Sequence, residues 1–304
     1  MIRILGTVFA GFLGLAFGSF LNVCVSRWPA GESIVHPRSH CRKCGRTLAW
    51  WENVPVVSWL GLGGRCRSCK ARIGWRYLLV ELAVGGLWAA VTWRLPASVS
   101  DPQLPGVSLL TLLISAIGQM AFYWLLVGLA VLDAENLWLP NRLTWPGIFI
   151  GLAFSLLNPA FGMEFDSITR LPLTYSSEYL RSGLWRTTIA DLLAILAAAG
   201  LILLIRWVYK LIRKREGIGL GDAKLMAMLA AWLGLSGALL AFALGAMLAA
   251  VAATVLLATP AIRRGDKSWA LTKLPLGTFL CVGGIVSGLW GPQILAVYMR
   301  WAGF

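Results

Sequence analysis

Charged residues are scarce in this sequence. They make up 13% of its 304 residues, whereas soluble domains carry about 25%. Hydrophobic residues make up 58%. This composition excludes an ordinary soluble domain and predicts an integral membrane protein. The first apolar run also lacks a small-residue cleavage site, so we expect no cleaved signal peptide, and there is no clean internal repeat.

The net charge of +14 could indicate a nucleic-acid partner, but the positions of the basic residues argue against one. Lysine and arginine flank the apolar runs, which is the arrangement that orients membrane helices. Many of the 16 tryptophans also lie near segment ends, as in the aromatic belts at membrane surfaces. We therefore expect the lipid bilayer as a partner and no nucleic acid.

The apolar runs predict an all-α polytopic membrane protein, since a spanning helix needs about 20 apolar residues. We identify eight candidate spans, at 4–26, 77–95, 107–132, 143–158, 185–205, 222–235, 237–259 and 275–298. Two parts are expected. Residues 1–95 hold the first two helices with a small polar segment, 27–76, between them, and residues 107–298 form a six-helix membrane domain. The loop at 159–184 shows no recognisable motif.

The distribution of lysine and arginine predicts the orientation. With eight spans, 21 of the 27 basic residues fall on one side of the membrane and 6 on the other. The positive-inside rule makes the basic side cytoplasmic, which places both termini outside and the 27–76 segment inside. In this topology Asp133 and Asp222 both fall at cytoplasmic ends of helices.

Four cysteines in the 27–76 segment form two CxxC pairs. They are Cys41, Cys44, Cys66 and Cys69. Two such pairs suit a tetrahedral structural zinc, and a metal would compensate for the few apolar residues of the segment. Redox pairs or unmetallated thiols are the alternatives, while disulfides are disfavoured in a reducing cytosol. Cys24 and Cys281 lie in apolar runs and are expected to pack as small hydrophobic residues.

Two aspartates stand at the edges of apolar runs, where an ionisable group is costly and is a functional candidate. Asp222 opens one run within Gly219–Lys224 (GLGDAK), and Asp133 closes another. The glycines allow another backbone to approach the Asp222 carboxylate. Two carboxylates that share one proton can activate water and protonate a peptide carbonyl. We interpret the two aspartates as a pair that cuts a peptide bond at a membrane surface.

Each acid also has a structural reading. Asp133 could be an interfacial cap or surface acid, and Asp222 could be an N-cap. Glu81 lies inside an apolar run and needs a partner, for which Arg76 is the nearest in sequence. An interfacial or structural role is favoured for Glu135, Asp191 and Glu216.

Several motifs, in order along nearly the whole chain, make it resemble the bifunctional type IV prepilin peptidases, a family of GxGD-type intramembrane aspartyl proteases. They are Gly18–Val23 (GSFLNV) with Arg27, Asn53–Leu60 (NVPVVSWL), Arg76–Leu82 (RYLLVEL), Leu132–Asp133 with Leu139–Thr144, Gly219–Leu225, and Lys273–Leu280. The two cysteine pairs flank the second of these. Thr278 stands where the last motif of the family usually has its second proline.

The resemblance implies that Asp133 and Asp222 are catalytic. It implies cleavage of the short basic leader from type IV prepilins or type II secretion pseudopilins, at the cytoplasmic face of the bacterial inner membrane. It also implies that the cysteine-bearing part methylates the new N-terminus with S-adenosylmethionine. No glycine-rich nucleotide fingerprint is present, and Glu81 is the candidate cofactor-binding residue.

Two functions of other classes compete with this one. A proton-coupled transporter would use the membrane carboxylates as a relay, near the bilayer midplane and beside broken helices. A non-catalytic scaffold would recruit partners through its zinc segment.

Overall fold

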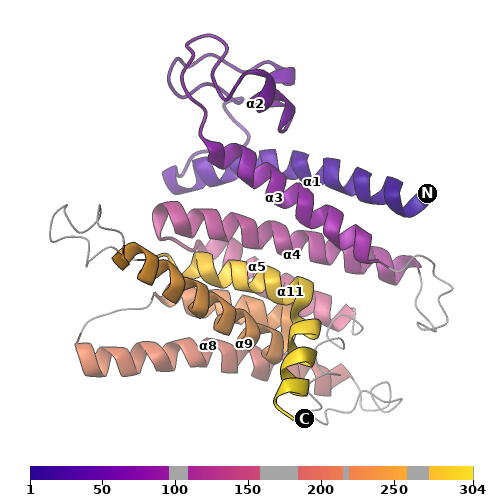
Figure 1. Cartoon of the computed structure of the whole chain (residues 1–304), viewed down its shortest axis with the longest axis vertical. Coiled ribbons are helices and arrows are strands. Elements are labelled where there is room, and N and C mark those ends of the chain that lie inside the picture. Colours follow the sequence, from indigo (N-terminus) through magenta and orange to yellow (C-terminus); the bar gives the residue numbers. More distant parts are fainter. Residues whose placement is uncertain (96–108, 158–183, 215–218, 259–273, 304) are drawn as a thin grey trace. The chain divides into compact units, whose positions relative to one another are not determined.

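A computed structural model describes most of the chain as helix (Figure 1). The described residues are 1–95, 109–157, 184–214, 219–258 and 274–303. Within these ranges there is no strand, only two isolated β-bridges. The loop predicted at 159–184 lies outside them, apart from its last residue. The chain divides into two compact units, Met1–Gly128 and Leu129–Phe304, and the boundary falls inside helix α4.

The first unit is built on a close pair of helices. Its elements are α1 (Ile2–Arg27), the 3-10 turns η1 (Trp28–Ala30) and η2 (Trp50–Asn53), α2 (Val57–Gly61), α3 (Trp75–Arg94) and the first part of α4 (Leu109–Asn136). Glycines bring α1 and α3 together: a Cβ at Gly14 would lie 2.9 Å from Gly85 Cα, and one at Gly18 would lie 2.7 Å from Glu81 Cα. Such small-residue contacts let membrane helices pack backbone to backbone.

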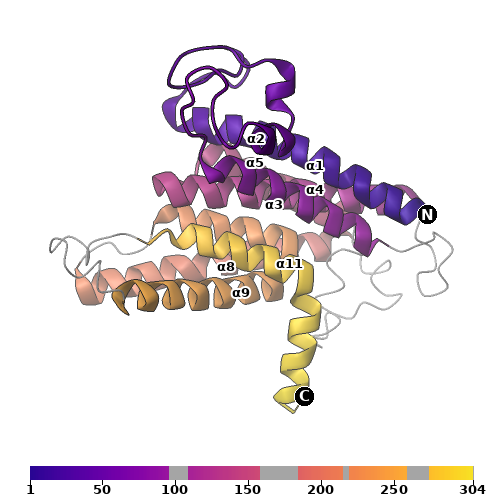
Figure 2. The ribbon, with the colours of Figure 1, turned by 45° about the horizontal axis from the view of Figure 1, so that its top comes forward.

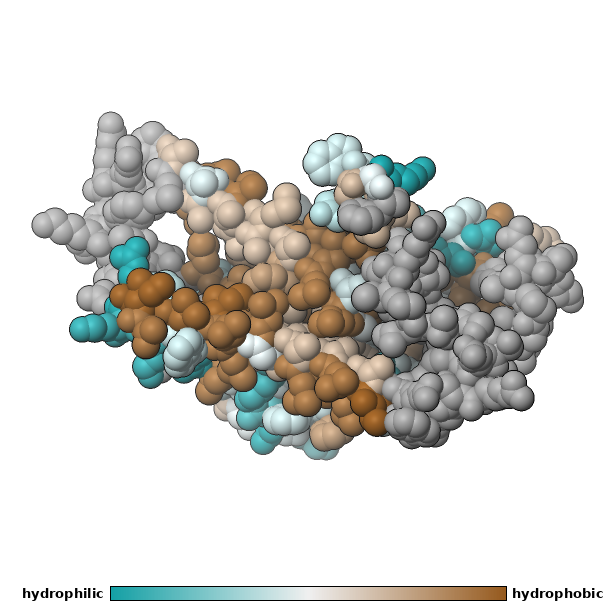
Figure 3. Space-filling model, turned by 90° about the horizontal axis from the view of Figure 1, so that it is seen from below, coloured by the Kyte–Doolittle hydropathy of each residue, from teal (hydrophilic) through white to brown (hydrophobic). Residues whose placement is uncertain are grey.

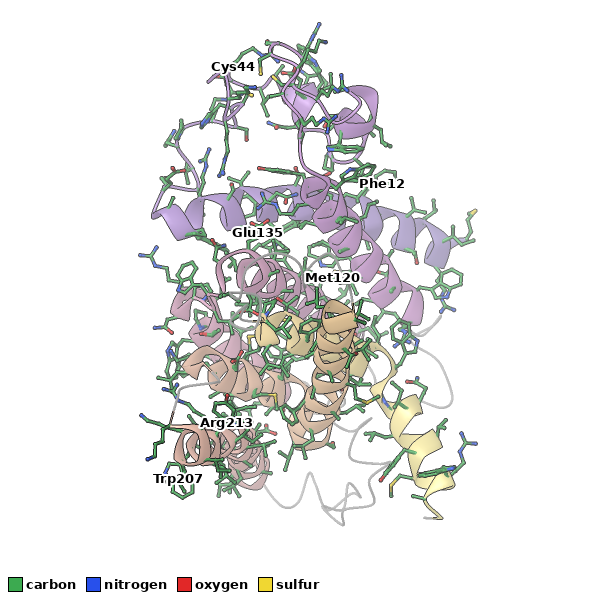
Figure 4. The ribbon with its side chains drawn as sticks, turned by 60° about the vertical axis from the view of Figure 1, so that its left-hand side comes forward. Phe12, Cys44, Met120, Glu135, Trp207 and Arg213 are labelled. Carbon is green, nitrogen blue, oxygen red and sulfur yellow. The ribbon has the colours of Figure 1, made fainter. Side chains whose placement is uncertain are left out.

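Tryptophan side chains connect α4 to this pair. The indole N–H of Trp88 on α3 donates to the Met120 carbonyl at 3.0 Å, and that of Trp124 on α4 donates to the Phe17 carbonyl at 3.1 Å. The segment between α1 and α3 folds back over the end of α1 and the start of α3, and it carries α2 and the cysteines (Figures 1 and 4).

The second unit surrounds helix α9. Its elements are the end of α4, α5 (Asn141–Leu157), α8 (Leu184–Arg213), α9 (Leu220–Ala258) and α11 (Leu276–Trp301). Residues 225–233 of α9 are all buried, because α5, α8 and α11 pack against this helix. Trp232 fills the contact with α5 and donates its indole N–H to the Gly147 carbonyl at 2.9 Å.

A glycine divides α9 into two helices. Its 39 residues would extend about 58 Å at 1.5 Å per residue, roughly twice the hydrocarbon thickness of a bilayer. Gly234 adopts φ +68° and breaks the helix, and the Ser287 hydroxyl of α11 donates to the nearby Gly237 carbonyl at 2.8 Å. α11 also bends (Figure 2), and it contains Pro292, which removes a helical hydrogen bond.

The predicted fold class is confirmed. Five described helices are long and apolar enough to cross a membrane: α1, α4, α8, α9 and α11. With α9 counted as two and with α3 and α5 added, the described helices correspond to the eight predicted spans. α8 extends beyond its predicted end at 205 to Arg213, since long basic side chains can reach the membrane surface from a continuing helix. Trp207 and Arg213 lie in this extension (Figure 4).

The described surface is strongly apolar. Brown side chains cover much of the face shown in Figure 3. On α8 alone, Leu193, Leu196, Leu204 and Trp207 are each more than half exposed. Soluble monomers rarely expose apolar patches of this extent, so lipid is the environment that such a surface fits.

We expect Gly283→Ala to destabilise the α9–α11 contact. A Cβ at Gly283 would lie 2.2 Å from the Ala241 carbonyl oxygen, so the two backbones must separate, at a cost of about 1–3 kcal/mol. Thermal unfolding of the purified protein in detergent measures this as a lower Tm. Gly200→Ala on α8 is the matched control, because open space surrounds that position. Equal melting temperatures for both variants would refute the packing argument.

Candidate active site and metal centre

Two aspartates lie at helix ends in the second unit. Asp133 occupies the last turn of α4, and Asp222 occupies the first turn of α9. They are 6% and 8% exposed, and one side chain, Leu139, lies against both Gly221, next to Asp222, and Gly277, which lies against the Asp133 carboxylate. The structure therefore brings into one site the two acids that the sequence singles out.

The start of α11 holds the Asp133 carboxylate. Asp133 Oδ2 accepts the backbone N–H of Thr278 at 2.7 Å, and the Thr278 hydroxyl lies 3.2 Å from the same oxygen. That hydroxyl also lies 3.0 Å from the Ala130 carbonyl oxygen on α4. First-turn N–H groups have no partner inside their own helix, and a helix N-terminus favours negative charge. Thr278 thus connects Asp133 to α11 and to the preceding turn of α4.

Two glycines allow these helix ends to meet. At Gly277 a Cβ would lie 2.9 Å from Asp133 Oδ2 and 3.0 Å from Leu139 Cδ1, and at Gly221 a Cβ would lie 3.1 Å from Leu139 Cβ. The Leu139 side chain therefore packs against the glycine beside each aspartate. A larger residue at 277 would collide with the Asp133 carboxylate, and one at 221 would collide with Leu139.

Asp222 takes part in starting its own helix. Its Oδ2 accepts the backbone N–H of Gly219 at 3.2 Å. α9 begins at Leu220, so Gly219 is the N-cap residue and Asp222 is the third helical residue, which reaches back to the N-cap as in a capping box. Asp222 is therefore not the N-cap residue that one interpretation of the sequence made it, because Gly219 occupies that position. One carboxylate oxygen serves the helix start, and the residue still lies in the site.

Two other charged residues of these helices, Lys224 and Asp191, have partners of their own. Lys224 Nζ lies 2.6 Å from Asn141 Oδ1, which ties the start of α9 to the start of α5. Asp191 on α8 accepts the hydroxyl of Ser155 at 2.9 Å. Glu216 lies outside the described residues.

The four cysteines of the first unit come together. Their sulfur atoms all lie within 4.8 Å of one another, and Cys41 Sγ is 3.7 Å from Cys69 Sγ. A tetrahedral site with metal–sulfur bonds of about 2.3 Å places its sulfurs about 3.8 Å apart. The donor set therefore fits one metal ion. Figure 4 shows Cys44 in the loops of this segment.

Each cysteine pair sits in the same kind of backbone turn. The N–H of Cys41 donates to the Arg46 carbonyl at 2.9 Å, and that of Cys66 donates to the Ala71 carbonyl at 2.8 Å. An isolated antiparallel bridge flanks each turn. The residue four positions after each of these two cysteines has positive φ: Gly45 at +70° and Lys70 at +55°. The segment thus contains two equivalent turns that present their thiols to one point.

Backbone N–H groups favour the thiolate in both turns. The N–H groups of Cys44 and Lys43 lower the pKa of Cys41 to about 6. Those of Cys69 and Ser68 lower the pKa of Cys66. Since the thiolate is the form that binds a metal, the first cysteine of each turn is arranged for ligation.

A cavity of about 820 Å³ lies in the first unit, between the cysteine segment, the end of α1 and the start of α3. Glu81, at 8% exposure, lines it. Glu81 Oε2 accepts the backbone N–H of Val56 at 2.7 Å, while Arg76 lies over the Tyr77 ring. Val56 is β-branched and has φ +61°, a strained conformation. The Glu81 contact thus anchors the cysteine segment to α3.

An ion pair stabilises the segment on another side of the cavity. Arg46 pairs with Glu52, which is buried. The Ala49 N–H and the Arg46 guanidinium hold the pKa of Glu52 below its usual value. This pair fixes η2 beside the first cysteine turn.

Two polar residues of these sites were given no role from the sequence. Thr278 contacts Asp133, and Asn22 lines the cavity at 2% exposure. The sequence did carry a signal for Asn22: it is a polar residue inside the first apolar run, and a buried polar group in a membrane helix needs a partner. The contact made by Thr278 depends on the fold and has no local signal.

Comparison with known proteins gives matches over most of the chain. Residues 12–95 match the family model described as Bacterial Peptidase A24 N-terminal domain, and residues 120–254 match the one described as Type IV leader peptidase family. No solved structure gave a significant match.

Curated relatives from several bacteria carry the name prepilin leader peptidase/N-methyltransferase. The one from Stutzerimonas stutzeri is 32% identical over 95% of this chain and 92% of its own length. The one from Pseudomonas aeruginosa is 33% identical over 96% and 93%, and the one from Myxococcus xanthus is 36% identical over 77% and 60%. The resemblance drawn from the motifs is confirmed, and the chain belongs to the type IV leader peptidase family.

Proposed function

We propose that this protein removes the short basic leader from type IV prepilins or type II secretion pseudopilins by aspartyl hydrolysis, and then methylates the new N-terminus. One observation supports cleavage most strongly: two buried carboxylates share a site at helix ends, each beside a glycine that permits the approach. The names of the relatives point to the same pair of activities.

Peptide hydrolysis by such a pair uses one ionised and one protonated carboxylate. The ionised member takes a proton from water, and the water oxygen forms a bond to the scissile carbonyl carbon. The protonated member gives its proton to the carbonyl oxygen. When the resulting diol collapses, the C–N bond breaks and a proton passes to the leaving nitrogen, which becomes the new amino terminus.

The expected substrate fits the position of the pair. A prepilin joins a basic leader to an apolar helix, so its scissile bond lies at the membrane surface. The basic flanks of the predicted spans favour a topology with Asp133 and Asp222 on the cytoplasmic side of the bacterial inner membrane and both termini periplasmic. The positive charge of the leader would keep it in the cytoplasm. The bond between the leader and the apolar helix would then lie at the cytoplasmic membrane surface, beside the two aspartates.

A proton-coupled transporter is the alternative. It would hold its carboxylates near the bilayer midplane, where unwound helices form the binding site. Asp133 and Asp222 instead lie in terminal turns. This placement favours the peptidase.

Methylation is assigned to residues 1–95, and cleavage to the membrane domain at 107–298. S-adenosylmethionine would supply a methyl group whose bond to sulfur breaks as the N–C bond forms. The first unit's cavity of about 820 Å³ falls within the range of about 300–1,000 Å³ that is usual for small-molecule sites. Glu81 lines this cavity and stays the candidate cofactor-binding residue, and Asn22 adds a buried acceptor. These residues fit a ligand that carries hydrogen-bond donors.

A structural zinc would hold the wall of this cavity. Cys41 and Cys66 both line the cavity, so the ion that ties the two turns together would also fix one side of the methylation site. We expect its loss to disorder the cysteine segment and to leave the aspartate pair in the second unit intact.

Asp133→Asn and Asp222→Asn should each reduce prepilin cleavage by about 10³-fold or more, because neither variant can share a proton between two carboxylates. Mass spectrometry of a co-expressed prepilin measures the cleavage. Glu135→Gln, an exposed position two residues from Asp133, is the control and should cleave normally. Normal processing by either asparagine variant would overturn the proposed function.

Thr278→Val should lower the cleavage rate by about tenfold, since valine keeps the backbone N–H to Asp133 and loses the hydroxyl. Thr278→Ser should restore near wild-type cleavage because it retains both donors. Initial rates with a synthetic prepilin peptide separate the two variants. If Thr278→Val cleaved as fast as wild type, the hydroxyl would have no part in holding Asp133.

Purified protein should contain one zinc per chain, and Cys41→Ser should lose both the zinc and methylation while cleavage persists. Elemental analysis gives the metal content, and mass spectrometry of the processed pilin gives the added methyl group. Cys24→Ala, outside the cluster, should retain both. A folded, metal-free wild-type protein with reduced cysteines would rule out the zinc site.

A further inference from the structure

We propose that Asn22 and Glu81 together bind a primary ammonium group inside the cavity of the first unit. Two molecules in the proposed methylation carry such a group: the new N-terminus of the cleaved pilin and the aminoacyl end of S-adenosylmethionine. This inference deepens the proposed methylation and rests on it.

Asn22 carries a hydrogen-bond acceptor that no group in the described part of the chain satisfies. The residue is 2% exposed, and its Oδ1 has no partner there. Its Nδ2 donates to the Tyr77 carbonyl oxygen at 2.9 Å. Because a carbonyl oxygen can only accept, the amide cannot be turned the other way. Oδ1 therefore stays a free acceptor on a residue that lines the cavity. Leaving such an atom buried without a donor is costly, so a ligand with an N–H group fits here.

Glu81 lies beside Asn22 along the contact between α1 and α3. On α1, Gly18 packs on the backbone of Glu81. Asn22 is four residues after Gly18, and it bonds to Tyr77, which is four residues before Glu81 on α3. Residues four apart share one face of a helix. The carboxylate and the amide oxygen thus occupy successive turns of one interface, and both line the same cavity.

The two side chains together form a site made of acceptors. Glu81 already accepts the Val56 N–H and the Ser19 hydroxyl, and a carboxylate has further lone pairs to offer. Five basic residues also line the cavity: Arg27, Arg42, Lys43, Arg67 and Arg72. Arg27 donates to the carbonyls of Ser33 and Pro37, and Arg42 donates to the Ser26 carbonyl, so these two charges are directed to backbone oxygens at the end of α1 and in the loop after it. A primary ammonium has three N–H donors and a positive charge, which matches one carboxylate and one amide oxygen.

The first arm of the test uses the full-length, zinc-loaded protein in lipid nanodiscs without S-adenosylmethionine. Its probe is an apolar peptide with the N-terminal sequence of a processed prepilin, either with a free amino group or acetylated. If the peptide supplies the ammonium, wild type should bind the free form about tenfold more tightly. Asn22→Leu and Glu81→Gln should each bring that ratio close to one.

The second arm compares S-adenosylhomocysteine with 5′-methylthioadenosine, which lacks the aminoacyl end. If the cofactor supplies the ammonium, the preference for S-adenosylhomocysteine should fall about tenfold in the same two variants. The arm in which the ratio falls identifies the source. If neither ratio changes in Asn22→Leu and Glu81→Gln, the proposal is overturned.

Asn22→Asp separates ligand binding from a structural role. Aspartate keeps an acceptor oxygen and loses the N–H that bonds to Tyr77, so we expect it to retain the wild-type ratio. A loss equal to that of Asn22→Leu would mean that the Tyr77 bond is what matters, and it would refute the proposal. The zinc content of each variant, which depends on the four cysteines of the same unit, reports that the first unit is folded.

Failure of this inference can be told apart from failure of the proposed function. Wild type that cleaves and methylates a prepilin, with ratios that the variants leave unchanged, refutes the ammonium site alone. Wild type that cleaves but never methylates, as judged by mass spectrometry, refutes the proposed methylation and this inference with it.

Discussion

A buried carboxylate at the end of a membrane helix needs hydrogen-bond donors from the protein, because little water reaches it. In the second unit those donors come from helix starts. The Thr278 N–H at the beginning of α11 serves Asp133, and the Gly219 N–H at the beginning of α9 serves Asp222. First-turn N–H groups have no helical partner of their own. One arrangement therefore satisfies the carboxylates and the helix ends together.

Close packing of backbones makes this arrangement possible. At Gly221 and Gly277 a side chain would collide with Leu139 or with Asp133 itself. The same device recurs away from the site, where Gly283 lies against the Ala241 carbonyl. In a membrane, helices gain little from excluding lipid and associate through such close contacts. Glycine is thus a packing residue at several helix contacts of this protein, and two of these glycines lie in the aspartate site.

The first unit contains a polar segment that has few apolar residues with which to form a core. Its segment between α1 and α3 is held at three points: the cluster of four cysteines, the Arg46–Glu52 ion pair, and the bond from the strained Val56 to Glu81. The third point uses a carboxylate from a membrane helix to fix a loop outside it. The cavity lies between this segment and the two helices, and four of the residues that attach the segment, Cys41, Glu52, Cys66 and Glu81, are among those that line it.

The sequence alone determined the membrane class, the eight helical segments, the cysteine cluster and the two aspartates, because apolar runs, CxxC spacing and charges in apolar runs are local signals. From the distribution of basic residues it also predicted that Asp133 and Asp222 lie on the same side of the membrane. Only the tertiary structure decided what holds these groups. Thr278 meets Asp133 across 145 positions of the chain, and Asn22 faces a cavity that exists only when the cysteine segment folds back on α1 and α3. Contacts of this kind depend on how helices pack, and no local pattern of residues encodes the packing.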